Sequence, residues 1–410
     1  MTATDILGFA GILLIIGFLS DYLFKKARIP DVLILIVLGY LIGPVLGIIE
    51  PSQIAPASHM ISSLALVIIL FNGGMDLDFT KVLSVAPRAI FLVLLGIAAS
   101  LALVAAFAYH LLGWELIDSL LLGAILSGTS PSIVMPLINR ARVSADASSV
   151  LSLESAFNGA LVIIIALVIL EIISTGNAEN GLSSVGQIIG IRFSLGAAIG
   201  AAAGFLWLWI LTLIEGETYD DILTLAVVFL LYFTVENISG SGVIFALVFG
   251  LILGNGVKVA QILRIKRTVE IHDLMKKFHS QMSFLIKTFF FVYLGLMISF
   301  SNFDVIVQGI ILSLMLLLAR HIVVLLTSIG NSTLFADRGI LTTMLPRGLS
   351  AAVIAEIVFA SGIPNASAYP EITIAVIVIT VVISAIGIPI FTRKSLRQTV
   401  EATAQEDDST

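Results

Sequence analysis

Ser152-Leu153-Glu154-Ser155-Ala156-Phe157-Asn158-Gly159 is a polar stretch that leads directly into the apolar run 160–170. Glu154 and Asn158 are four residues apart and Ser155 precedes Asn158 by three, so a helix would carry all three side chains on one side. That side cannot face lipid, because a carboxylate inside a bilayer costs roughly 3 kcal/mol even by insertion scales. The stretch therefore predicts a membrane helix with a functional polar face that needs a partner elsewhere in the chain.

The composition indicates the class of protein. Of 410 residues, 59% are hydrophobic and 12% are charged, and apolar segments of about 18 or more residues, enough to cross a bilayer, recur throughout. The sequence predicts an all-α polytopic membrane protein embedded in the lipid bilayer. Without cysteine, and with five scattered histidines, it offers no thiolate or histidine cluster for a metal. We expect no enzyme, no cofactor, no resident metal site and no nucleic acid partner.

Thirteen transmembrane spans are expected. They are 6–24, 32–49, 59–74, 87–112, 117–138, 150–172, 186–213, 222–236, 240–255, 282–300, 304–328, 338–360 and 371–392. Lys and Arg accumulate in alternate loops, and basic loops stay in the cytoplasm. The pattern predicts a multi-pass protein of the cell (inner or plasma) membrane, with its N-terminus outside and its C-terminus in the cytoplasm.

Internal repetition predicts two inverted halves. Gly39 and Gly43 in span 2 are echoed by Gly250 and Gly254 in span 9, and 73–75 in span 3 is echoed by 295–297 in span 10. Such glycine spacings permit close helix packing, and inverted repeats are typical of secondary transporters. We divide the chain into 1–255 (first repeat, connecting span and start of the second repeat), a cytoplasmic amphipathic linker at 256–281, the remaining second repeat at 282–392, and a cytoplasmic tail at 393–410.

Two spans are expected to be broken. Span 5 contains Ser127-Gly128-Thr129-Ser130-Pro131-Ser132, and span 12 contains Thr342-Thr343-Met344-Leu345-Pro346-Arg347-Gly348-Leu349-Ser350. Gly, Pro and small hydroxyl residues interrupt a helix, and unwound backbone at membrane depth is tolerated where it is buried or lines a wet cavity. Arg347 cannot lose its proton to escape burial, so we expect it to be the counter-charge of Glu154.

Short motifs in the membrane part share their order and spacing with one transporter family. They are Leu70-Phe71-Asn72-Gly73-Gly74-Met75, Gly128-Thr129-Ser130-Pro131, Leu153-Glu154-Ser155-Ala156-Phe157-Asn158, Gly240-Ser241-Gly242-Val243-Ile244 with Gly250 and Gly254-Asn255, Leu318-Ala319-Arg320, and Pro346-Arg347-Gly348-Leu349. By these motifs the sequence resembles the monovalent cation/proton antiporter superfamily, and more narrowly its thirteen-span sodium/proton exchanger branch. The resemblance implies a core domain built on crossed, unwound spans 5 and 12 that slides against a dimerisation domain, and hence a homodimer.

The resemblance also implies roles for individual residues. Glu154 and Arg347 would form a buried ion pair that acts as a structural tie. The backbone around Thr129, the hydroxyl of Ser155 and the amide of Asn158 would shape the ion site. The transported species would be a proton and a monovalent cation, Na⁺, K⁺ or Li⁺.

Three positions that can carry an acid in this family are neutral here. The Asn-Asp pair of span 6 is Asn158-Gly159, the acid of span 5 is Ser130, and a span 3 carboxylate falls at or beside Asn72. Competition between a cation and a proton needs a titrating group. Three functions remain open: an antiporter whose proton site has moved or is neutralised, a proton-uncoupled transporter of an anion or neutral solute, and a non-transporting membrane sensor.

The other charges within spans have narrower interpretations. Glu154 is either the structural tie or a direct proton carrier, and Glu236 is a second candidate proton carrier. Glu356 is expected to form a structural ion pair, with Arg320 or Lys287 as its partner. Lys287 lies near the cytoplasmic end of span 10, where a lysine can extend its amine to the membrane surface.

Overall fold

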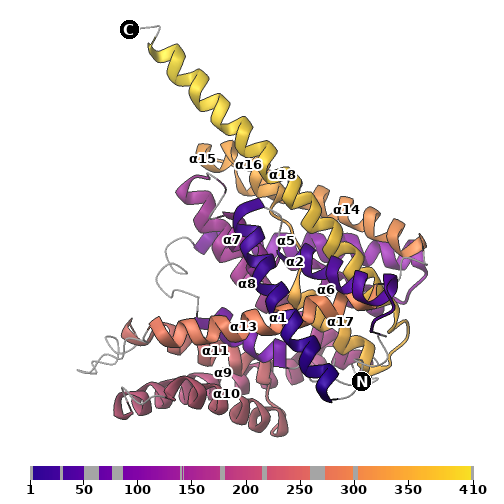
Figure 1. The fold of residues 1–410 in the computed structure, drawn as a ribbon, viewed down its shortest axis with the longest axis vertical. Coiled ribbons are helices and arrows are strands. Elements are labelled where there is room, and N and C mark those ends of the chain that lie inside the picture. The colour runs from indigo at the N-terminus through magenta and orange to yellow at the C-terminus, as the bar shows by residue number, and fades with distance from the viewer. Residues whose placement is uncertain are drawn as a thin grey trace.

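The computed structural model describes residues 3–27, 31–49, 64–75, 86–138, 141, 143–175, 181–214, 219–258, 273–298 and 303–407. This part of the chain is helical and contains no strand (Figure 1). Within it, six helices are long and apolar enough to cross a membrane: Arg88–Leu112, Ala145–Ser174, Gly190–Leu213, Lys277–Met297, Phe303–Thr327 and Ala368–Thr392. The predicted all-α polytopic membrane fold is confirmed.

The helices follow the predicted spans in chain order. They are α1 (Ala3–Ala27), α2 (Asp31–Tyr40) with the π-helical turn η1 (Leu41–Val45), the helix Leu64–Met75, α5 (Ala86–Phe107) with the π-helical turn η2 (Ala108–Leu112), α6 (Leu116–Ser127), α7 (Pro131–Ile138), α8 (Ala145–Thr175), α9 (Gly181–Leu213), α10 (Asp220–Asn237), α11 (Gly242–Gly254), α13 (Asp273–Met297), α14 (Phe303–Thr327), α15 (Ser332–Ala336), α16 (Arg338–Thr343), α17 (Leu349–Ser361) and α18 (Ala368–Asp407). Residues 59–63 of predicted span 3 lie outside the described residues.

The segment predicted as a surface linker, 256–281, is divided differently in the structure. Residues 259–272 lie outside the described part, but from Asp273 onward the chain already belongs to α13. His279 is buried, and its ring meets that of Phe71 edge-on with 5.0 Å between centroids. Residues 273–281 are therefore the start of the span 10 helix. At the other end, the tail continues α18 as a helix to Asp407, which projects from the bundle in Figure 1.

Glycines of the repeated motifs pack against helices from the other half of the chain. Gly39 on α2 faces the backbone of Val292 and Gly295 on α13, with 2.9 Å from a Cβ built at Gly39 to the Cα of Gly295. In the second pair of helices, Gly250 on α11 lies against the carbonyl of Phe71 in the helix Leu64–Met75. Span 2 thus pairs with span 10 as span 3 pairs with span 9, which is the reciprocal arrangement expected of inverted repeats. These glycine faces are used inside one chain.

Gly250→Ala is expected to lower the free energy of unfolding by about 1–3 kcal/mol, the usual cost of overpacking. A Cβ at this position would overlap the carbonyl oxygen of Phe71, so the two helices must separate. Gly96→Ala on α5 is the matched control, because its Cβ would meet no atom within 4 Å. Thermal melting of the detergent-purified variants measures the difference. Equal melting temperatures for the two would contradict the proposed contact.

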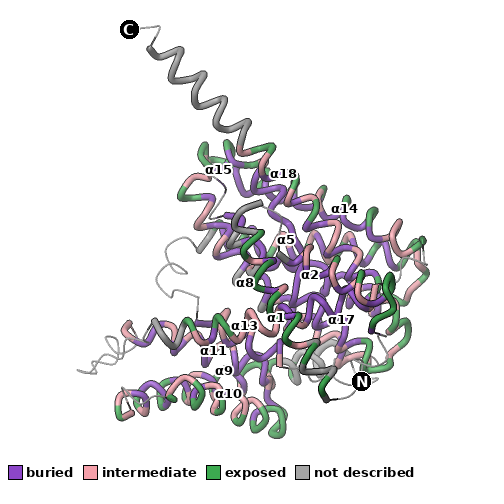
Figure 2. The backbone as a smooth tube through the Cα atoms, viewed as in Figure 1, coloured by how far each residue is buried: buried purple, intermediate pink, exposed green. Residues whose placement is uncertain are grey.

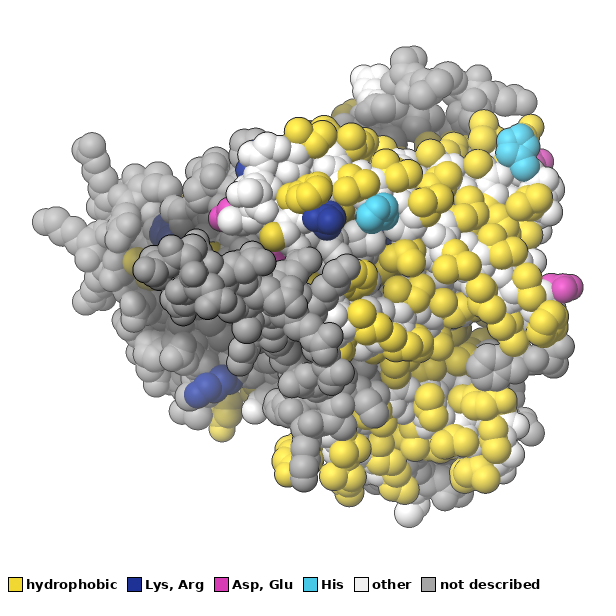
Figure 3. All heavy atoms as spheres, turned by 90° about the horizontal axis from the view of Figure 1, so that it is seen from above, with side chains coloured by type: hydrophobic (Ala, Val, Ile, Leu, Met, Phe, Trp, Pro, Cys, Tyr) yellow, Lys and Arg dark blue, Asp and Glu magenta, His cyan; other side chains and the backbone are white. Residues whose placement is uncertain are grey.

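Apolar side chains are divided between the interior and the outside of the bundle. Figure 2 shows buried residues concentrated in the middle of the bundle and exposed ones on its outer helices. Large apolar side chains such as Phe18, Trp209 and Leu318 are exposed, and apolar side chains cover much of the face in Figure 3. An apolar exterior around a helical bundle is the surface that a lipid bilayer covers.

Candidate functional site

Two helix breaks cross at the centre of the bundle. One separates α6, which ends at Ser127, from α7, which begins at Pro131, and the other separates α16 from α17. The N–H of Ser130 donates to the carbonyl of Pro346 at 2.9 Å, and the Arg347 Nη1 donates to the carbonyl of Ser127 at 3.2 Å. Each break therefore satisfies a backbone group that the other leaves unpaired. The predicted crossing of unwound spans 5 and 12 is confirmed.

The local sequence explains why the chain unwinds at this point. Pro131 has no N–H to donate and is the first residue of α7, where a helix tolerates proline, while its ring disfavours helical geometry at Ser130. Gly348 lies directly against the side chain of Ser130, where a Cβ would overlap both side-chain atoms. The two breaks can approach this closely because position 348 has no side chain.

Two hydroxyl residues on α18 also support the crossing, and the sequence alone did not identify them. Thr380 accepts the backbone N–H of Arg347 at 3.1 Å, and Ser384 donates to the carbonyl of Thr343 at 2.8 Å. Both side chains are buried. Their spacing of four residues within a mainly apolar stretch of α18 is the signal that would have pointed to them.

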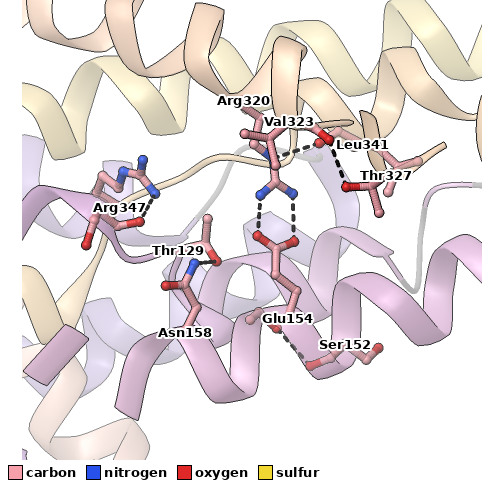
Figure 4. Close-up of polar contacts among 11 residues, drawn as sticks. Thr129, Ser152, Glu154, Asn158, Arg320, Val323, Thr327, Leu341 and Arg347 are labelled. Atoms are coloured by element: carbon pink, nitrogen blue, oxygen red, sulfur yellow. Dashed lines mark hydrogen bonds and ion pairs between the residues drawn. The ribbon is translucent and has the colours of Figure 1, made fainter. Parts of the chain in front are cut away.

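The residues predicted to shape the ion site meet beside this crossing (Figure 4). Asn158 on α8 donates from Nδ2 to the Oγ1 of Thr129 at 3.2 Å, and both side chains are 2% exposed. Ser130 and Ser155 are equally buried, and Ser155 donates to the carbonyl of Ser152 at 3.2 Å. The remaining acceptor, the Oδ1 of Asn158, is buried and has no hydrogen-bond partner.

Gly159 lies against the first residue of α7. A Cβ built on it would be 3.7 Å from the Cδ and 4.0 Å from the Cγ of Pro131, which is ordinary contact distance. A side chain at this position would start beside the break in span 5 without displacing backbone. The absence of an acid at 159 is therefore a matter of sequence and is not imposed by lack of space for a Cβ.

Asn72 is placed differently from the rest of the predicted ion site. Its amide Nδ2 donates to the carbonyl of His279 at 3.1 Å and to the hydroxyl of Ser283, both on α13. Its Oδ1 is buried without a hydrogen-bond partner. Asn72 thus joins the helix Leu64–Met75 to α13, and its hydrogen bonds do not reach Thr129 or Asn158.

The buried ion pair of Glu154 has a different partner from the one predicted. Arg320 on α14 binds both carboxylate oxygens of Glu154, with Nη2 to Oε2 at 2.8 Å, and its Nε donates to the carbonyl of Leu341 at 3.0 Å. Figure 4 shows the guanidinium facing the carboxylate in a two-pronged arrangement. Such pairing satisfies both groups and ties α8, α14 and α16 together. The predicted pair of Glu154 with Arg347 is wrong.

Arg347 points in another direction because it belongs to unwound chain and not to a helix face. Its side chain is 2% exposed and donates to Ser127, while its Nε has no hydrogen-bond partner. Among the described residues it forms no ion pair. The crossing consequently contains a buried positive charge that no carboxylate of the described chain neutralises.

The predicted ion pair of Glu356 is also absent from the described part of the chain. Glu356 is 4% exposed, and its Oε2 accepts a hydrogen bond from the hydroxyl of Tyr293 on α13 at 3.3 Å. Its Oε1 has no partner. Arg320 is bound to Glu154, and Lys287 is half-buried on α13 without forming an ion pair with Glu356.

Glu236 lies at the edge of a cavity of about 500 Å³ enclosed mainly by α8, α9, α10 and α11. Its Oε1 accepts the N–H of Gly242 at 2.8 Å, which stabilises the first turn of α11. The same cavity is lined by Glu171 and Arg192, which form an ion pair between α8 and α9. It also reaches Ile357 on α17. The role of Glu236 as a proton carrier remains a prediction.

Known proteins are similar to this chain in sequence and in fold. Over 381 residues the chain is 27% identical to the probable Na(+)/H(+) antiporter 2 of Methanocaldococcus jannaschii. This alignment covers 89% of this chain and 87% of the antiporter. The chain is 25% identical to the K(+)/H(+) antiporter NhaP2 of Shewanella sp. (strain MR-4), covering 88% of this chain and 61% of that protein. The solved sodium proton antiporter MjNhaP1 from M. jannaschii at pH 8 superposes with a TM-score of 0.81 at 23% identity, over 97% of this chain and 100% of that chain.

The family assignment rests on the extent of the match. Residues 11–394 fit the family described as sodium/hydrogen exchanger, transmembrane. This range includes every helix that contributes to the crossing, from α6 to α18 as far as its Ser384. The chain belongs to the transmembrane sodium/hydrogen exchanger family.

Proposed function

We propose that this protein is a secondary transporter, not an enzyme, and that it exchanges a monovalent cation (Na⁺, K⁺ or Li⁺) for protons. Membership of the sodium/hydrogen exchanger family supports the proposal, as do the activities named for the two relatives. Those names differ in the cation, so the choice between Na⁺ and K⁺ is left to experiment.

One observation carries the proposal: the unpartnered amide oxygen of Asn158 at the crossing. A buried polar atom without a hydrogen bond costs about 1–3 kcal/mol, and an ordered water or a bound ion is one of the ways in which natural proteins satisfy such an atom. Oxygen atoms are the ligands that hard cations select. With the hydroxyl of Thr129 beside it, the Oδ1 of Asn158 forms part of a small all-oxygen site in the break of span 5.

The cavity of about 500 Å³ provides a route toward the outer ends of the spans. Two carboxylates, Glu171 and Glu236, and one guanidinium, Arg192, line it, so its fixed charge is negative and attracts cations. In this scheme the core with α6, α8 and α17 moves relative to α9 and α10. The ion pair of Glu171 with Arg192 joins these two parts, and it would break as the core moves.

The same scheme includes an orientation in the cell membrane. The loop before α8 and the loop before α16 touch each other, since the N–H of Ser144 donates to Asp337 at 2.8 Å and Thr333 donates to Asp146 at 2.9 Å. Both loops belong to the set assigned to the cytoplasm by their basic residues. This contact supports a shared side for the two loops, and the cytoplasmic C-terminus and external N-terminus are proposed from the basic residues. A homodimer is proposed on the family resemblance alone.

The test is cation-driven proton movement in proteoliposomes. Vesicles with an internal pH dye and an imposed pH gradient should lose the gradient when NaCl, KCl or LiCl is added, and should keep it when choline chloride is added. Protein-free vesicles are the matched control. No response to any of the three alkali cations would reject antiport by this chain.

A second candidate function is favoured by Arg347. A buried guanidinium with a free Nε and no carboxylate partner in the described chain is suited to an anionic solute. In that case the gradient would respond to the anion, and choline chloride would act as strongly as NaCl. The choline arm of the same assay therefore separates the two functions.

A further inference from the structure

We propose that Glu356 carries the proton that this transporter exchanges, in place of the acid missing beside Asn158. The inference rests on the proposed antiport function. Glu356 has three features that such a group needs: it is buried, it is bonded only to a neutral hydroxyl, and it lies on one of the two broken helices.

The surroundings of Glu356 favour the neutral carboxylic acid. Its side chain is 4% exposed, Tyr293 supplies one hydrogen bond at 3.3 Å, and the Oε1 has none. Burying a carboxylate without a counter-charge is prohibitive, and the group takes up a proton instead. A carboxyl that is protonated in the absence of a cation, and that can ionise when a cation enters, is the requirement for exchange.

Four elements pack closely against α17: α6, α8, α13 and α18. The described titratable groups in the membrane-spanning parts of these helices are Asp118 on α6, Asp146, Glu154 and Glu171 on α8, Lys277, His279, Lys287 and Tyr293 on α13, and Tyr369 and Glu371 on α18. Glu154 is paired with Arg320 and Glu171 with Arg192, and of these groups only Tyr293 is bonded to Glu356. No described positive charge therefore holds Glu356 in its ionised form.

Asp118 is the rival buried acid, since it is 2% exposed with an unpartnered Oδ1. It lies in the first turn of α6, where the positive end of the helix dipole favours a negative charge. Glu356 is seven residues past the start of α17, beyond the turn that the dipole reaches. The two acids therefore differ in what stabilises their ionised forms.

Glu356 lies on the helix that begins at the crossing, and its neighbour in the chain lines a cavity. Seven residues of helix place Glu356 about 10 Å along α17 from its first residue, Leu349, at the crossing. We infer that a cation beside Asn158 and a charge on Glu356 interact through a low-dielectric interior that salt does not screen. The next residue, Ile357, lines the cavity of about 500 Å³. In the proposed exchange step Glu356 gives its proton to water in that cavity. The positive charge of the entering cation takes the place of the charge of the departing proton.

The transport test compares Glu356→Gln with the matched variant Asp118→Asn in the proteoliposome assay. Glutamine has nearly the size of protonated glutamate and can still accept from Tyr293, so its melting temperature should equal that of the wild type. We expect alkali-cation-driven proton movement to fall to the level of protein-free vesicles in Glu356→Gln and to remain in Asp118→Asn. Wild-type exchange in Glu356→Gln, or loss of exchange only in Asp118→Asn, overturns the proposal.

A binding test separates this inference from the proposed function. Protein in detergent and weak buffer should release protons when NaCl, KCl or LiCl is added, relative to choline chloride, and Glu356→Gln should release none. Release that depends on Glu356 without transport in vesicles would support the proton site and reject antiport. No release from the wild type overturns the inference, as does failure of Glu356→Gln to fold, because a neutral carboxyl tolerates the neutral replacement.

Discussion

Membranes that express Arg320→Met are expected to contain little folded protein. The substitution leaves the carboxylate of Glu154 buried at 1% exposure without its two-pronged partner. Removing one member of a buried ion pair typically costs about 3–5 kcal/mol, a large part of the roughly 5–15 kcal/mol by which a native fold is stable. Fluorescence size-exclusion chromatography of detergent extracts, followed over a temperature series, measures the loss.

The double variant Glu154→Gln/Arg320→Gln is the control for that experiment. It removes both charges together, so neither is left unpaired, and it should recover much of the stability lost in Arg320→Met. Transport by the double variant then separates the two roles considered for Glu154. Retained exchange identifies Glu154 as a structural tie, whereas a folded double variant without exchange would make Glu154 a proton carrier.

Gly159→Asp is expected to increase cation-driven proton exchange. The new side chain begins beside Pro131 at contact distance and follows Asn158 in the chain. A charged ligand adds roughly 1.5–3 kcal/mol to a hydrogen-bonded site, which corresponds to a roughly ten- to hundredfold tighter cation site. The measurement is the cation concentration that gives half-maximal loss of the pH gradient.

Gly159→Asn separates charge from size in this experiment. Asparagine fills the same space without a carboxylate, so it should leave cation affinity near the wild-type value. The combination Gly159→Asp/Glu356→Gln adds a second check, since an acid at 159 should restore exchange that Glu356→Gln removes. An effect of Asn equal to that of Asp would contradict the electrostatic explanation.

The two breaks in spans 5 and 12 could be predicted from the residues because the signal is local, whereas their crossing was expected from the family resemblance. Gly128, Pro131, Pro346 and Gly348 disfavour a regular helix wherever they occur, and their polar neighbours exclude contact with lipid. The alternation of basic loops and apolar spans likewise needs no tertiary information. These features are contained in short stretches of chain, and the structure reproduces the two breaks and the apolar helices.

The partners of the charged residues could not be predicted in the same way. Helical periodicity places Glu154 and Asn158 on one face, but Arg347 lies in unwound chain, where periodicity says nothing about the direction of a side chain. Arg320 reaches Glu154 because of how α14 is rotated about its axis in the bundle, which is a property of the packing. Asn72 was assigned to the ion site by the family resemblance. Its observed hydrogen bonds to His279 and Ser283 depend on which helix lies opposite it, and the sequence does not show this.

The reciprocal glycine contacts impose an order on assembly in the membrane. The helices that contain Gly39 and Gly74 are synthesised first, but the backbones that they contact belong to α11 and α13. Until residues 242–297 are inserted, the small-residue faces of the first half have only lipid or other protein as neighbours. The bundle can therefore close only late in synthesis, and truncated chains would present these unfilled faces to the quality-control machinery of the cell.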